Sequence, residues 1–246
     1  MLDDSSNLDF NFWPSFADSM LAVVFILVVI LVFVAQQGLT GLSDIRESQG
    51  IVVESIAARY DGTLDTLQQS PTESKYVIRN DGESEVTVAQ DVQLQRITFS
   101  GNVLFSQNDY RLTRRGEKVL QNVGESIQPQ LSRVRQIQIE GHTDLFPTDQ
   151  YPGGNLELGA RRARSVFRFL EQQVGIDPVQ HLMSTTSYGP YSPVGRSPGD
   201  DYGREKLRKA NDSEEKRRRN RRVELLLFYG DSDSSAVAAD RSSSAK

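Results

Sequence analysis

The chain has 246 residues, of which 33 are acidic and 28 basic, so its formal net charge is −5 at pH 7. A negative net charge disfavours a general nucleic-acid binder, which must neutralise phosphates. With no cysteine and two histidines, the chain has few of the side chains from which zinc sites and nucleophilic catalytic sites are built.

The first feature along the chain is an apolar run. A short acidic tail covers residues 1–11, and a helix is predicted over residues 12–36. Residues 16–35 cover about 30 Å at ~1.5 Å per residue, which is the thickness of a bilayer core. A cleaved signal peptide is disfavoured, because no lysine or arginine precedes Arg46 and because the run is too long. We therefore expect one transmembrane helix.

The orientation of this helix is not set by its flanking charges. Arg46 and Arg59 follow the run, and no basic residue precedes it, which weakly favours a cytoplasmic C-terminal side. A long translocated domain overrides so small a bias, so either orientation stays open.

Asp18 lies near the start of the apolar run. A carboxylate at the edge of a membrane core costs a few kcal/mol unless something compensates for it. One explanation is a functional group that binds an ion. The other is a carboxylate that reaches water or caps the start of the helix, where an acidic side chain is favourable.

Residues 37–74 are predicted to form a helical connector. Glycines interrupt the segment, and a modest apolar face comes from Ile51, Val52, Ile56 and Ala57. Such a segment can continue the membrane helix, pair with a second copy, lie on the membrane surface or act as a plug. A simple connecting helix is the alternative.

Residues 75–230 are predicted to form one α/β domain. Its strands are expected at residues 76–79, 85–88, 92–99, 103–105, 134–140, 183–188 and 223–229. Helical spacing of apolar residues covers 112–131 and 156–174. Strands that alternate with helices predict a mixed sheet with helices packed on it, an α+β architecture. Residues 231–246, rich in serine, aspartate and alanine, are expected to be disordered.

Residues 139–170 combine a carboxylate and a guanidinium at a strand-to-helix junction. A strand ends near Gly141, the loop behind it carries Asp144, and a helix that starts near Asn155 carries Arg162. If both groups reach one pocket they can clamp a zwitterion, with Asp144 on an ammonium and Arg162 on a carboxylate. A structural salt bridge between the two is the alternative, and spacing alone does not separate them.

This stretch resembles the OmpA-like peptidoglycan-binding domain, whose pattern is TD followed by N-x-x-L-x-x-x-R-A-x-x-V on a helix. The matching residues are Thr143, Asp144, Asn155, Leu158, Arg162, Ala163 and Val166. The segments NVLFSQNDYRLTRRGEKVL (102–120) and NRRVEL (220–225) also match, so the resemblance covers about residues 95–230. It implies an OmpA-like α/β sandwich in which Asp144, Arg162 and Asn155 bind the diaminopimelate of the cell-wall stem peptide. The loop after TD is longer than usual, and Leu158-Gly159 stands where the family has Leu-Ser.

The long loop and the N-terminus resemble the MotB branch of this family, the stator subunits of ion-driven motors. The loop and helix read HTDLFP and NLELGARRA, and the membrane entry W-x-x-[YF]-A-D-x-M is matched by Trp13, Phe16, Ala17, Asp18 and Met20. The resemblance implies that Asp18 carries H⁺ or Na⁺ and that no other cofactor is needed. It implies a homodimer inside a pentamer of MotA-like multi-helix membrane subunits. It also implies a single-pass inner-membrane protein with a cytoplasmic N-terminus and a periplasmic C-terminal domain.

The short acidic tail and the short linker are unlike flagellar MotB proteins. In size and layout the chain is more similar to the ZorB subunits of the Zorya anti-phage systems, which implies a ZorA-like partner and a role in defence. A flagellar-type stator is one alternative. Another is a passive wall tether in which Asp18 only caps the helix.

No other motif predicts chemistry. His142 and His181 are the only histidines, and no nucleotide-binding or hydrolase motif is present, so we expect neither a metal site nor an enzyme. The basic run KRRRNRR (216–222) follows Glu214 and Glu215. We interpret it as a solvated or wall-facing basic surface and expect no nucleic-acid partner.

Overall fold

The computed structural model describes residues 13–60, 63–70, 73–80 and 83–230. The tails expected at 1–11 and 231–246 lie outside these residues. The chain divides into two compact units, Met1–Asp44 and Ile45–Lys246, and each is described by itself.

The first unit consists of the N-terminal part of one long helix, α1 (Trp13–Tyr60). Its segment Phe16–Gln36 has a mean hydropathy of 2.9, and its leucine, valine, isoleucine and phenylalanine side chains are exposed. A stretch of this length and composition can cross a bilayer, which confirms the predicted membrane helix as a candidate span. Glycines at 38, 41 and 50 do not end the helix, because each costs only about 1 kcal/mol in a helix interior.

The last turns of α1 belong to the folded second unit. Val52 and Ile56 are fully buried in its core, and the hydroxyl of Tyr60 donates to the carbonyl of Val119 at 3.1 Å. Gln49 donates to the carbonyl of Asp91 at 3.0 Å. The folded unit therefore begins at Ile45, and not at residue 75 as the sequence suggested. Of the apolar face expected for the connector, Val52 and Ile56 pack here, whereas Ile51 is 41% exposed.

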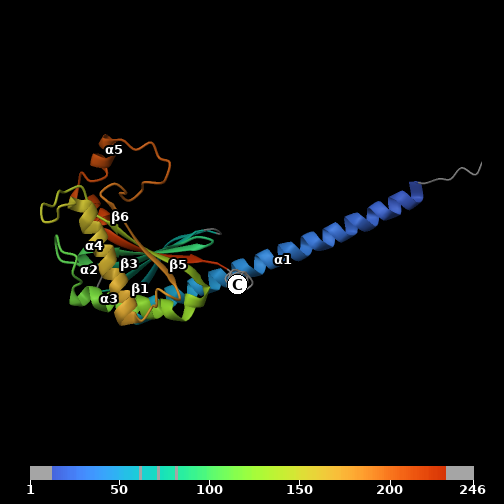
Figure 1. The fold of residues 1–246 in the computed structure, drawn as a ribbon, viewed down its shortest axis with the longest axis horizontal. Coiled ribbons are helices and arrows are strands. Elements are labelled where there is room, and N and C mark those ends of the chain that lie inside the picture. Colours follow the sequence, from blue (N-terminus) through green and yellow to red (C-terminus); the bar gives the residue numbers. More distant parts are fainter. Residues whose placement is uncertain (1–12, 61–62, 71–72, 81–82, 231–246) are drawn as a thin grey trace, which may run out of the picture. The chain divides into compact units, whose positions relative to one another are not determined.

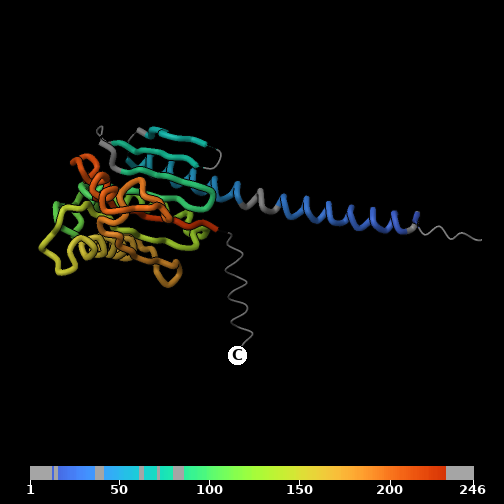
Figure 2. Tube along the Cα trace, turned by 90° about the horizontal axis from the view of Figure 1, so that it is seen from above, coloured from blue at the N-terminus to red at the C-terminus, as the bar shows by residue number. Residues whose placement is uncertain are grey.

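A seven-stranded mixed sheet forms the centre of the second unit, in the order β1-β2-β3-β4-β7-β5-β6. Its strands are β1 (Thr63–Gln69), β2 (Ser74–Asn80), β3 (Glu83–Gln90), β4 (Leu94–Ser100), β5 (Val134–His142), β6 (Leu182–Gly189) and β7 (Arg222–Tyr229). Every neighbouring pair is antiparallel except β5 and β6. Figure 2 shows β1–β3 side by side at one edge of the sheet, in cyan.

Two strand predictions need correction. β1 lies inside the segment that was expected to be a helical connector, because its exposed edge position leaves no regular apolar alternation to detect. Residues 103–105 do not form a strand. Val103 and Leu104 belong instead to a short helix, α2 (Gly101–Leu104), and Phe105 forms an isolated bridge with Leu112.

The helices pack on one face of the sheet, as Figure 1 shows for α3 (Arg114–Ile127) and α4 (Gly154–Phe169). The 3-10 helix η1 (Gln128–Arg133) follows α3, and the π-helical turn η2 (Leu170–Val174) follows α4. Alternate residues of the central strands face this layer and are buried: Ile97, Phe99, Ile137, Ile139, Val223, Leu225 and Leu227. Two short helices, α5 (Arg204–Lys209) and α6 (Glu214–Asn220), precede β7. The predicted α+β fold, a mixed sheet with helices packed on it, is confirmed.

Candidate functional site

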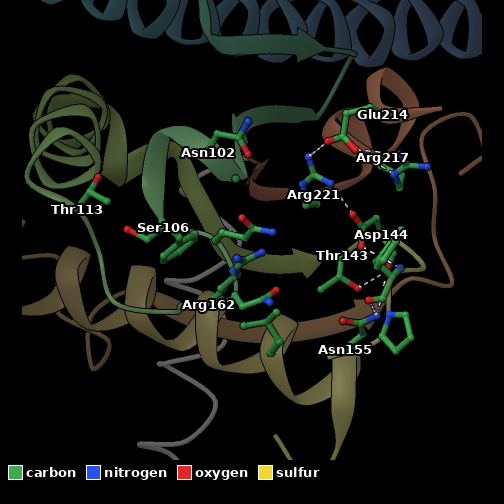
Figure 3. Close-up of a pocket in the computed structure, with 17 residues that line it drawn as sticks. Asn102, Ser106, Thr113, Thr143, Asp144, Asn155, Arg162, Glu214, Arg217 and Arg221 are labelled. Atoms are coloured by element: carbon green, nitrogen blue, oxygen red, sulfur yellow. Dashed lines mark hydrogen bonds and ion pairs between the residues drawn. The ribbon is translucent and has the colours of Figure 1, made fainter. Parts of the chain in front are cut away.

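A cavity of about 750 Å³ lies where β5 ends and the chain turns toward α4. Its lining comes from segments far apart in the sequence, and Figure 3 labels ten of its polar residues: Asn102, Ser106, Thr113, Thr143, Asp144, Asn155, Arg162, Glu214, Arg217 and Arg221. Three of these, Asp144, Asn155 and Arg162, are the residues that the sequence predicted to form a binding site.

Asp144 is buried just beyond the end of β5. Its Oδ2 lies 2.5 Å from Nη1 of Arg221, and its Oδ1 accepts the backbone N–H of Phe146 at 3.1 Å. The neighbouring Thr143 donates its backbone N–H to the carbonyl of Gly189 at 2.9 Å, which ties the loop to the end of β6. The carboxylate is therefore held in one orientation.

Arg162 reaches the same cavity from α4. It is 5% exposed, its Nε donates to the carbonyl of Asp109 at 2.9 Å, and its guanidinium lies 5.1 Å from the ring centroid of Phe105. Burial lowers the pKa of Arg162 to about 10, and the nearby charge of Arg221 acts in the same direction. Within the described residues Arg162 is in no ion pair, so its charge is available to an anion in the cavity.

Asn155 braces the loop between these groups. Its Nδ2 donates to the carbonyl of Asp144 at 3.1 Å and to the carbonyl of Phe146 at 2.7 Å. The side chain thus links the first turn of α4 to the loop that carries the carboxylate, and it also lines the cavity.

The close packing of α4 on β5 fixes the geometry of the site. A Cβ added to Gly141 would lie 2.0 Å from the carbonyl oxygen of Gly159, and one added to Gly159 would lie 2.4 Å from Oγ of Ser187. A side chain at position 141 would therefore collide with the backbone of α4, whereas the nearest atom at position 159 belongs to the side chain of Ser187. The close approach of α4 to β5 thus requires glycine at position 141.

Arg221 and Glu214 are site residues that the motif analysis did not single out. Nη2 of Arg221 lies 2.5 Å from Oε1 of Glu214, so Arg221 bridges two carboxylates. Burial acts to lower the pKa of Arg221, but its hydrogen bonds to Glu214 and Asp144 outweigh burial and raise it. Arg221 lies in the segment 220–225 that matched the family pattern, so the sequence could have pointed to it. It also lies in the basic run 216–222, which was interpreted as a solvated or wall-facing surface.

A second polar cluster lies on the other side of the sheet. Carboxylate oxygens of Glu140 and Glu224 and a ring nitrogen of His142 lie within 4.8 Å of one another, and all three residues are buried. However, Glu224 already accepts from Arg96 at 2.5 Å and from Arg222 at 2.6 Å. With two arginines beside two glutamates, a divalent cation would meet almost no net negative charge. The cluster fits a buried ionic network better than a metal centre.

Asp18 lies on the first unit, on the exposed apolar part of α1. The helix already includes Trp13, so Asp18 follows the first turn. Backbone N–H groups are unsatisfied only in that first turn, so Asp18 is not positioned to cap the helix.

Comparisons with known proteins agree with the fold. Residues 104–221 match the OmpA family. The periplasmic domain of Helicobacter pylori MotB has 26% identity and a TM-score of 0.52, covering 72% of this chain and 99% of that chain. A second structure of that domain has 25% identity and a TM-score of 0.50, with 71% and 99% covered.

A putative MotB-like protein from Desulfovibrio vulgaris has 20% identity and a TM-score of 0.55, covering 77% of this chain and 99% of that chain, which supports the fold alone. No curated protein matches the sequence. The folded unit therefore has an OmpA-like fold: its residues 104–221 are similar to the OmpA family, and it is similar to the periplasmic domain of Helicobacter pylori MotB.

Proposed function

We propose that this chain is a membrane-anchored protein that binds peptidoglycan through the cavity at the end of β5. The observation that carries the proposal is the desolvated guanidinium of Arg162, which faces the cavity without an ion pair among the described residues. Keeping an unpaired arginine buried is costly, so a site of this kind is built for an anionic group.

The ligand we propose is the diaminopimelate of the stem peptide. The free end of diaminopimelate carries an ammonium and a carboxylate a few ångströms apart. Arg162 would hold the carboxylate bidentately, and Asp144 would take the ammonium. The binding function requires no catalytic group, and we propose no enzymatic activity.

We further propose that the chain is a single-pass protein of the bacterial inner membrane, with its N-terminus in the cytoplasm and the cavity in the periplasm. The span Phe16–Gln36 and the similarity to a periplasmic MotB domain support this orientation. The charges that flank the span favour neither side strongly.

The finer proposal is a stator-type ion-driven motor subunit. Asp18 would carry H⁺ or Na⁺ as two copies of the chain work inside a pentamer of MotA-like or ZorA-like subunits. Its place beyond the first helical turn, on an exposed apolar surface, favours this role over helix capping. A role in anti-phage defence rests on the resemblance to ZorB, and a passive tether is the alternative function.

The test of wall binding uses the full chain in detergent. Co-sedimentation is measured with insoluble peptidoglycan that contains diaminopimelate and with peptidoglycan that contains lysine at that position. Lysine lacks the second carboxylate, so we expect clear preference for the diaminopimelate polymer, and loss of that preference in Arg162→Gln. Equal binding to both polymers would contradict the proposed ligand.

A further inference from the structure

The surface next to the cavity is strongly basic. Between Arg196 and Arg222 the chain has eleven arginines and lysines against six acidic residues, although the whole chain has a net charge of −5. Most of this positive charge lies on α5 and α6 (α5 is labelled in Figure 1), which we call the basic helix pair.

The basic helix pair is held in place by two buried asparagines. Nδ2 of Asn220 donates to Oδ1 of Asn211 at 2.9 Å, and these side chains are 2% and 7% exposed. Oδ1 of Asn211 also accepts the backbone N–H of Leu145 at 3.2 Å, in the loop that lines the cavity. Oδ1 of Asn220 accepts the backbone N–H of Val194 at 2.9 Å. The basic helices are thus fixed relative to the binding loop.

Some of the basic side chains are neutralised within the pair. Ion pairs join Lys209 to Glu205, Lys216 to Asp212 and Arg217 to Glu214. Four exposed arginines have no ion pair among the residues that the structure describes: Arg204, Arg208, Arg218 and Arg219. They form an excess of positive charge that faces solvent.

Helix α6 connects this charge to the cavity. Glu214 and Arg217 line the cavity, and Arg218 and Arg219 follow directly on the exposed side of the same helix. An extended ligand that enters the cavity past α6 would meet these arginines next. The polymer proposed above carries carboxylates on every stem peptide, so its charge is complementary to that of the surface.

We propose that the basic helix pair is a second contact with peptidoglycan, which binds carboxylates of neighbouring stem peptides while the cavity holds one. The inference rests on the proposed function and extends it from a single ligand to a polymer. Exposed ion pairs are individually weak, but several that act on one tethered polymer add to the affinity of the cavity. The basic surface thus favours intact wall over soluble fragments.

The experiment measures binding of the full chain to insoluble sacculi and to a soluble muropeptide, at low and high salt. Two variants remove two charges each: Arg204→Gln/Arg208→Gln on α5 and Arg218→Gln/Arg219→Gln on α6. The matched control is Arg164→Gln/Arg168→Gln, which removes two exposed arginines from α4. Vesicles of phosphatidylcholine and phosphatidylglycerol and a random-sequence oligonucleotide serve as other anionic partners.

We expect each basic-helix variant to bind sacculi about threefold to tenfold less tightly at low salt, with a smaller effect at high salt. Muropeptide binding and the control variant should remain unchanged. An equal loss in the control, no loss on sacculi, or a loss confined to vesicles or oligonucleotide would overturn the proposal. If the wild-type chain fails to bind sacculi at all, the proposed function itself fails.

Discussion

Nη1 of Arg221 lies 2.5 Å from Oδ2 of Asp144, whereas Arg162, for which a salt bridge to this carboxylate was one alternative, makes its hydrogen bond to the carbonyl of Asp109. The carboxylate is therefore neutralised before any ligand arrives. An ammonium that enters the cavity must share Asp144 with Arg221 or displace it. Arg162 approaches the site from α4 and Arg221 from the junction of α6 and β7, so Arg162 remains available to bind an anion.

This pairing predicts that Asp144 and Arg221 are energetically coupled. Arg221→Gln should lower the free energy of unfolding by about 1–3 kcal/mol, because it leaves a buried carboxylate without its cation. Adding Asp144→Asn should restore part of the loss, which a double-mutant cycle in urea would measure. Additive effects of the two substitutions would show that the pair is not coupled. Arg219→Gln, an exposed neighbour, is the control.

Arg162 should matter for binding more than for folding. Arg162→Gln removes a buried cation, so we expect little loss of stability but at least a tenfold loss of muropeptide affinity, since hydrogen bonds to charged groups contribute about 1.5–3 kcal/mol. Calorimetry of binding and thermal unfolding of the same variant separate the two effects. Arg161→Gln is the control, because its side chain is exposed and pairs with Glu157. Similar losses of affinity in both variants would contradict the assignment.

The carboxyl group of Asp109 should make the stability of the fold depend on pH in the acid range. A hydrogen bond from the Arg111 side chain is the largest cause that lowers the pKa of Asp109, from 3.8 to about 2. A carboxyl group with a lowered pKa in the folded state stabilises the fold above its unfolded pKa, and this stability is lost as pH falls through the folded value.

Asp109→Asn should therefore destabilise the protein at neutral pH, and the difference from wild type should vanish as pH falls from 3.8 to about 2. Urea unfolding of both proteins across this range measures the difference. Asp177→Asn, in the turn before β6, is a control without a described arginine partner. A difference that persists in acid would mean that the amide disrupts the loop for another reason.

The end of α1 should behave as part of the core. Ile56→Ala should lower the free energy of unfolding by about 2–5 kcal/mol, because Ile56 is fully buried against the sheet. Ile51→Ala on the same helix is the matched control, since Ile51 is 41% exposed. A similar, small loss in both variants would place the start of the folded unit after α1.

Asp18 should be dispensable for assembly and essential for ion coupling. Asp18→Asn keeps the size of the side chain and removes the group that can bind a proton or a cation. Co-expressed with a candidate MotA-like multi-helix membrane protein, the variant should still form the proposed complex but should lose ion flux and cellular function. Asp18→Glu, which keeps a carboxylate, should retain part of both. Full function in Asp18→Asn would leave the passive tether as the better explanation.

Much of the molecule follows from local sequence pattern. The apolar run predicts the candidate span, alternation predicts the central strands, and helical spacing predicts α3 and α4, because each pattern reflects which face of one element is buried. Three residues of the cavity, Asp144, Asn155 and Arg162, were also predicted, since they lie in the loop after β5 and on the helix that follows it.

Contacts between distant segments could not be predicted in this way. β7 enters the sheet between β4 and β5, and this pairing brings Arg221 to Asp144 across 77 residues of sequence. The start of the folded unit at Ile45 has the same origin, because the apolar face of a helix does not reveal whether a membrane, a second copy or the chain's own sheet covers it. Burial is a property of the assembled fold, and here the sheet order determines which cation Asp144 meets.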